Sequence, residues 1–187
     1  PAAGDNAPVR VMVREGPHRS YGAGAAYSTS EGFGGNVFWQ HRNFFHRGER
    51  FGVAATAAEQ EQSIAASLDV NAFRRRDQRL LADVKLTRED PDAFTRYAAE
   101  AAAGIERPLS DHWTALVGGA VEYTNVRDAD GRRNFYLLGG RGALRWDNTD
   151  SLLDPRRGQR LFISARPYVG QQSGTLQFTV LETTASI

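Results

Sequence analysis

The feature that most constrains this chain is a two-residue alternation of apolar and polar side chains along nearly its whole length. Between residues 62 and 72 it puts Ile64, Leu68 and Val70 on one side and Asp69 on the other. Successive side chains of a strand point to opposite faces, so this period indicates β-strands with one apolar and one polar face.

Ten such segments are expected after residue 20, separated by clusters of turn-forming residues. They are 21–28, 35–45, 51–58, 62–72, 79–88, 94–106, 113–125, 134–146, 159–169 and 175–181. The alanine-rich stretch 98–103 has helical propensity, but the period of its neighbours favours a strand. Short turns between consecutive segments predict an all-β, antiparallel up-and-down meander.

The alternation does not by itself say which face meets water. A soluble sheet buries its apolar face, whereas a membrane barrel turns that face to lipid and its polar face to a lumen. Here Ala, Val, Leu and Ile dominate the apolar faces, and aromatic residues lie mostly near segment ends, as interfacial girdles do. Segments of about ten residues or more are also long for a soluble sheet. We therefore expect transmembrane β-barrel strands.

Composition and motifs argue against other functions. The chain has no cysteine and a net charge of +1, which gives no support for disulfides, thiolate metal sites or nucleic-acid binding. The acidic run near residue 150 lacks the spacing of a calcium loop and is typical of a turn that bonds its own backbone. Ser110, Asp111 and His112 are adjacent, which does not make a catalytic triad. We expect no catalytic residue, no metal and no cofactor.

Three sequence stretches carry a resemblance to a known family. They are VRVMVREGP with YGAGAAYSTSEGFGG in residues 9–35, QHRNFFHRGERF in residues 40–51, and LRWDNTDSLLDPRRGQRL in residues 144–161. Together they resemble the BamA/TamA superfamily of outer-membrane assembly factors, with TamA the nearest member. In that family the second and third stretches form periplasmic hairpin turns. The residues that carry these turn motifs are Asn43, Gly48, Glu49, Asp147, Asp150, Asp154, Pro155 and Gly158.

The resemblance also implies a domain organisation. Residues 1–17 would be the end of a preceding POTRA-like domain and its linker, including a strand at 9–15. Residues 18–187 would be the N-terminal portion of an outer-membrane barrel of about sixteen strands, about ten of which are present. We accordingly expect this chain to be a fragment. No signal-peptide pattern opens it.

The function implied by the family is not enzymatic. It is insertion of outer-membrane proteins, or autotransporter translocation, through a laterally opening barrel in a Gram-negative outer membrane. Partners would be client proteins, outer-membrane lipid and a periplasm-spanning protein reached through POTRA domains. A two-partner-secretion pore and the barrel anchor of an outer-membrane enzyme are the alternatives. The lateral gate would be the short, glycine-rich first strand, weakened by its glycines; its residues are Tyr21, Gly22, Ala23, Gly24, Ala25 and Tyr27.

Overall fold

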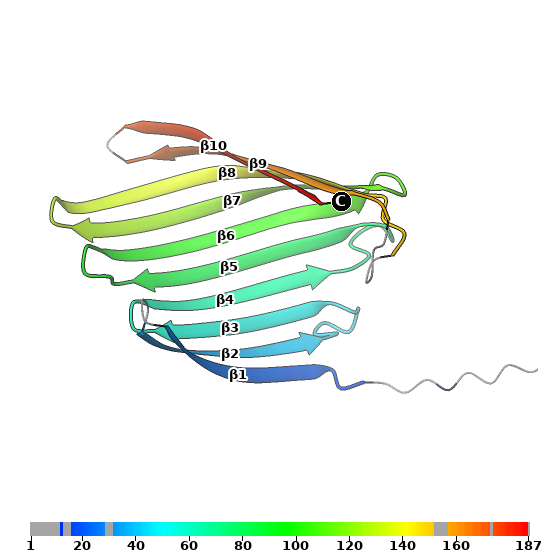
Figure 1. Ribbon diagram of the computed structural model, residues 1–187, viewed down its shortest axis with the longest axis horizontal. Coiled ribbons are helices and arrows are strands. Elements are labelled where there is room, and N and C mark those ends of the chain that lie inside the picture. Colours follow the sequence, from blue (N-terminus) through cyan, green and yellow to red (C-terminus); the bar gives the residue numbers. More distant parts are fainter. Residues whose placement is uncertain (1–11, 13–15, 29–31, 152–156, 173, 187) are drawn as a thin grey trace, which may run out of the picture.

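The computed structural model describes residues 12, 16–28, 32–151, 157–172 and 174–186. They form one antiparallel sheet of ten strands in chain order, each paired with the next (Figure 1). The strands are β1 (Arg19–Ser28), β2 (Gly32–Arg42), β3 (Arg50–Ala58), β4 (Glu61–Val70), β5 (Arg79–Glu89), β6 (Thr95–Pro108), β7 (Trp113–Asp128), β8 (Gly131–Asp147), β9 (Arg160–Gln171) and β10 (Thr175–Ser186).

The ten expected strands and the meander are confirmed. The alanine-rich stretch 98–103 lies inside β6, where both neighbouring strands bond to it and override its helical propensity. Strand β2 ends at Arg42 and not at 45, because Asn43 has a positive φ and opens the turn. The strand expected at residues 9–15 lies outside the described residues, apart from Met12.

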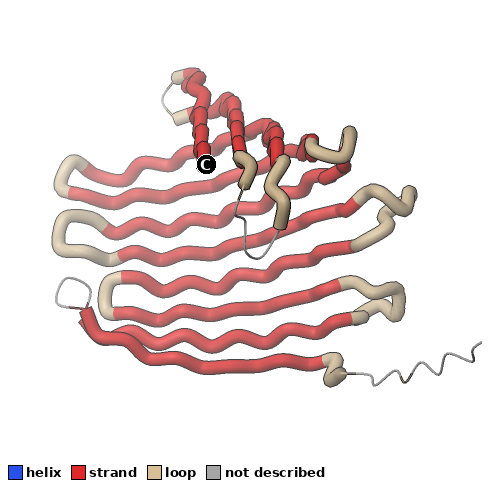
Figure 2. The backbone as a smooth tube through the Cα atoms, turned by 45° about the vertical axis from the view of Figure 1, so that its right-hand side comes forward, coloured by secondary structure: helices blue, strands red, loops and turns tan. Residues whose placement is uncertain are grey.

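The sheet curls across its width, and β8 to β10 bend over one of its faces (Figures 1 and 2). The side chains identify the inside of the curl. A guanidinium nitrogen of Arg141 on β8 lies 2.9 Å from a carboxylate oxygen of Asp83 on β5. Three strand spacings separate these strands, about 14 Å in a flat sheet. The two side chains can meet only because this face is concave, and we call it the inner face.

The opposite, outer face carries the apolar half of the alternation. The register aligns Ile64 with Leu86 and aligns Ala66 with Val84 on this face. Their exposure is high: Ile64 is 57% exposed and Leu86 is 52% exposed, whereas Thr87 on the inner face is 6% exposed. The apolar side chains of β4 and β5 therefore point away from the inside of the curl.

Burial in this sheet is the reverse of burial in a soluble domain. Ala98 is the only buried hydrophobic residue in the described part of the chain, while Glu49, Thr87, Thr124 and Ser164 are buried polar residues. A single layer with a large exposed apolar face requires an apolar cover. No helix in the described segments is long and apolar enough to cross a membrane.

Strand β10 departs from the expected orientation. Its apolar residues Leu176, Phe178 and Val180 align with inner-face residues of β9, and Phe178 stacks on Tyr168 with ring centroids 5.1 Å apart. Its outward positions include Gln177, which aligns with Val169. The expectation that the apolar side of every strand faces outward is therefore wrong for β10, because pairing register with β9, not local alternation, sets its faces.

Candidate functional site

Two aromatic groups border an uncharged zone on the outer face. Tyr123 and Tyr136 pair across β7 and β8 with ring centroids 5.0 Å apart, and Trp113 pairs with Trp146 at the other end of these strands. Tyr123 and Trp113 are ten residues apart, about 33 Å along the strand. At the usual barrel tilt of about 40°, that is about 25 Å of height, the thickness of a membrane barrel's apolar band.

The strand positions between these aromatic groups are uncharged on the outer face. On β5 and β6 they run from Leu80 to Leu86 and from Ala99 to Ile105, and on β7 and β8 they alternate small and aliphatic residues. The outward arginines lie toward the strand ends, where Arg88 contacts Asp90 and Arg107 contacts Asp77. An uncharged zone bounded by aromatics is what contact with hydrocarbon requires.

The inner face carries a charged network that includes Arg79, Asp83, Lys85, Arg160 and Arg166. Each has an ion-pair partner on this face. The closest group joins three strands: Arg79 on β5 contacts Asp69 on β4 at 2.6 Å and Glu106 on β6 at 2.8 Å. A face with paired charges and half-exposed side chains suits a water-filled interior and does not mark a reaction centre.

The predicted gate strand β1 is paired along its whole length with β2, and its other edge has no partner strand among the described residues. It is ten residues long, against nine for β3. With β4, it is shorter than every other described strand except β3, and its weakness as a gate stays a prediction. Tyr21, Ala23, Ala25 and Tyr27 lie on the outer face, in register with Trp39, Val37, Gly35 and Phe33.

The glycines of β1 make room for two side chains of β2. A Cβ on Gly22 would overlap the ring of Phe38, and a Cβ on Gly24 would lie 2.5 Å from the amide oxygen of Asn36. Phe38 and Asn36 therefore cover the inner side of the edge strand, as aromatic residues do for edge glycines in other sheets. Sequence reasoning missed Phe38 and Asn36. They can be found as the residues opposite Gly22 and Gly24 once the register of the β1–β2 hairpin is known.

The first motif turn, between β2 and β3, is held by its own polar groups. Asn43 and Gly48 have φ values of 74° and 78°, and the Gly48 amide donates to the Asn43 side-chain oxygen at 2.8 Å. The Arg47 amide donates to the Glu49 carboxylate at 3.0 Å. His46 also has a positive φ of 65°. Asn43, Gly48 and Glu49 are thus explained by turn geometry.

Glu49 is buried in this turn, at 3% exposed, so the charge state of its carboxyl group affects the stability of the turn. Burial of the carboxyl acts to raise its pKa, but backbone amides of Glu49, Arg47 and Phe45, together with the charge of Arg47, outweigh it and lower the pKa. The carboxylate is therefore the form that the turn stabilises.

The second motif turn, between β8 and β9, uses its aspartates for backbone bonds. The Asp147 carboxylate accepts from the Thr149 amide at 3.0 Å, and the Asp150 carboxylate accepts from the Arg157 amide at 3.2 Å. Gly158 has a φ of 109°, and a Cβ there would lie 2.6 Å from the Asn148 carbonyl oxygen. The prediction of a turn bonding its own backbone is confirmed for these residues. Asp154 and Pro155 lie outside the described residues.

Both motif turns lie at the same ends of the strands as the start of β1 (Figure 1). An even number of antiparallel strands separates the three positions, so the chain is back at this end of the sheet at each of them.

A model of the Omp85 superfamily domain matches residues 43–187, most of the chain. The chain belongs to the Omp85 superfamily. The fold of this Omp85 chain is similar to the crystal structure of BamA from Haemophilus ducreyi lacking POTRA domains 1-3, with a TM-score of 0.69 at 14% sequence identity. The likeness covers 85% of this chain and 37% of that one.

The resemblance to the BamA/TamA superfamily is confirmed, and the ten strands are arranged as in part of a BamA barrel. The chain spans little more than a third of the BamA chain. No curated protein sequence matches it. That TamA is its nearest relative stays a prediction.

Proposed function

We propose that this Omp85 chain is the N-terminal part, residues 18–187, of a laterally opening barrel in a Gram-negative outer membrane. It inserts outer-membrane proteins or translocates autotransporters, and it catalyses no chemical reaction. The observation that carries the proposal is the uncharged, aromatic-bounded outer face opposite a charged inner face, in a member of the Omp85 superfamily. Residues 1–17 are assigned to the end of a POTRA-like domain, through which a periplasm-spanning partner binds.

The gate is assigned to β1. When the seam between β1 and the final barrel strand opens, the edge of β1 has unpaired backbone donors and acceptors, to which a client strand can add by β-augmentation. The two motif turns lie at the end of the sheet where β1 begins, and this end is assigned to the periplasmic side. The assignment lets β1 follow directly from a periplasmic domain.

Cross-linking in the full-length protein tests the gate. Cysteines replacing Ala23 or Ala25 should cross-link to a stalled client, whereas a cysteine replacing Ala66, on the central strand β4, should not. A disulfide joining β1 to the final barrel strand should stop assembly without unfolding the barrel. Full activity of the locked protein would refute lateral opening.

The same experiment separates the alternatives. A two-partner-secretion pore should export its client through the lumen and stay active with the seam locked. A barrel that only anchors an enzyme should yield no client cross-link at either alanine.

A further inference from the structure

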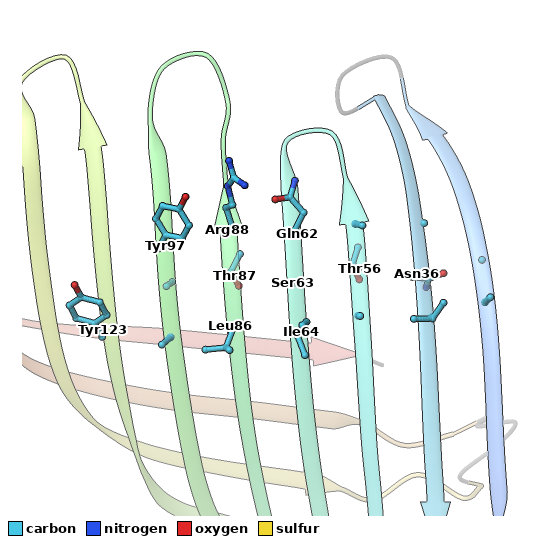
Figure 3. A pocket seen from close by; sticks show the side chains of 18 residues that line it. Asn36, Thr56, Gln62, Ser63, Ile64, Leu86, Thr87, Arg88, Tyr97 and Tyr123 are labelled. Carbon is cyan, nitrogen blue, oxygen red and sulfur yellow. The ribbon is translucent and has the colours of Figure 1, made fainter.

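The outer face has two shallow apolar hollows beside the tyrosines. The first, of about 830 Å³, spans β1 to β7 and is lined by small residues such as Ala55 and Ala57. Ile64 and Leu86 line it on the central strands β4 and β5 (Figure 3). The second, also about 830 Å³, spans β5 to β10. Ala99 and Tyr123 line both, so the hollows adjoin. Small outward residues thus leave room for flexible apolar chains against the sheet.

Outward arginines lie at this end of the strands: Arg88 is directly opposite Tyr97, and Arg127 and Arg132 lie beyond Tyr123 and Tyr136, toward the turn. The Arg88 guanidinium lies 5.8 Å from the centre of the Tyr97 ring, at the end of the first hollow (Figure 3). Arg127 and Arg132 are exposed and directly opposite each other across β7 and β8. The next residue along β8, Arg133, points to the inner face and pairs with Asp128.

The Arg127 and Arg132 pair is unusual in this sheet. Like charges directly opposite each other destabilise strand pairing. Among the described residues neither guanidinium has a carboxylate within ion-pair distance, and Arg88 already pairs with Asp90. Asp90 and Asp92 border Arg127 on its turn side. An anion on the membrane side of the two arginines would relieve their repulsion.

We propose that this surface binds a phosphate-bearing anionic lipid of the surrounding leaflet, with its phosphate between Arg127 and Arg132 and its acyl chains in the two hollows. The proposal rests on the membrane location proposed above. Guanidinium groups form bidentate, charge-assisted hydrogen bonds with phosphate. Tyr97, Tyr123 and Tyr136 lie at the level where headgroup meets acyl chain, which is where aromatic residues prefer to sit.

Lipid retention by the full-length protein tests the headgroup contact. The protein is equilibrated with phosphatidylglycerol or with zwitterionic phosphatidylcholine, and bound lipids are counted by native mass spectrometry. The wild type should prefer phosphatidylglycerol. The double variant R127A/R132A should weaken that lipid by about tenfold, since each surface arginine contributes severalfold. Arg133→Ala, on the same strand but facing inward, should leave the preference unchanged.

A second variant tests the hollows. Ala99→Trp places a large side chain where the two hollows adjoin and should lower retention of both lipids, while the charge preference persists. A wild type that retains the two lipids equally, or an R133A variant as impaired as the double variant, would overturn the proposal.

The membrane location is measured separately. A spin label at Ile64 should contact lipid in the wild type and in R127A/R132A alike. If that contact is present without a lipid preference, only the lipid site is refuted. If it is absent, the membrane location itself fails.

Discussion

Asp83 and Val84 are neighbours on β5 with opposite surroundings. Asp83 lies on the inner face and contacts Arg141, while Val84 lies on the outer face, 49% exposed and in register with Ala66 and Ala101. The effect of a substitution in this chain therefore depends first on the face that the residue occupies.

This difference predicts unequal costs for the same substitution. Val84→Arg should destabilise the barrel by about 2–4 kcal/mol, the cost of an arginine at the bilayer midplane, whereas Asp83→Arg stays in water and should cost less. Unfolding titrations of both variants in a bilayer give the comparison. Equal costs, or a larger cost for Asp83→Arg, would mean that the faces are assigned backwards.

Glu49 gives a prediction for pH dependence. Its pKa is lowered in the folded turn, so its contribution to stability is present above its ordinary pKa and is lost as pH falls through the folded pKa. Glu49→Gln should therefore be less stable than the wild type at neutral pH, with the difference shrinking in acid. Urea unfolding midpoints from neutral to acid pH measure this. A constant difference at every pH would contradict it.

At the scale of elements, the two motif turns both contain a glycine with a positive φ but differ in the space around it. The β2–β3 turn needs positive φ values and leaves open space around Gly48, while the β8–β9 turn folds back so closely that Gly158 touches the backbone of Asn148 and Thr149. Glycine is required by conformation in the first turn and by conformation and space in the second.

The two turn glycines make a matched test. Gly48→Ala should cost about 1 kcal/mol, the penalty of a left-handed alanine, because nothing lies within 4 Å of its Cβ. Gly158→Ala meets the Asn148 carbonyl oxygen at 2.6 Å as well and should cost more. Unfolding free energies of the two variants, measured side by side, decide this. The opposite order would show that the β8–β9 turn relaxes easily.

At the scale of the whole molecule, the sheet is a curved wall with a charged inside and an apolar outside. No other layer of the described chain covers the outer face, so this apolar face is stabilised by whatever surrounds it. The partly exposed ion pairs of the inner face each contribute little to stability.

This architecture predicts a sharp contrast between alternate residues in the assembled protein. Spin labels replacing Ile64 and Leu86 should be accessible to lipid-soluble oxygen, and labels replacing Ser63 and Asp83 should be accessible to a water-soluble relaxation agent. Accessibility measurements in vesicles give the pattern. Labels at Ile64 and Leu86 that report a packed protein interior would refute the prediction that the outer face contacts lipid.

The sequence by itself determined the strands, their number and the self-bonded turns. A period of two is a local property, written in neighbours such as Asp83 and Val84, and Asx side chains such as Asn43 and Asp150 bond backbone groups only a few residues away. These features do not depend on what the strands pack against.

Only the tertiary structure decided which face is concave, how β10 is turned and which charges meet. The Arg141–Asp83 contact joins strands separated by two others, the faces of β10 follow its register with β9, and Arg127 meets Arg132 only through the β7–β8 pairing. Each depends on curl or register, which are set by the whole set of strand pairs. The alternation along one strand does not determine curl or register, because it is the same in a flat sheet and in a curved one.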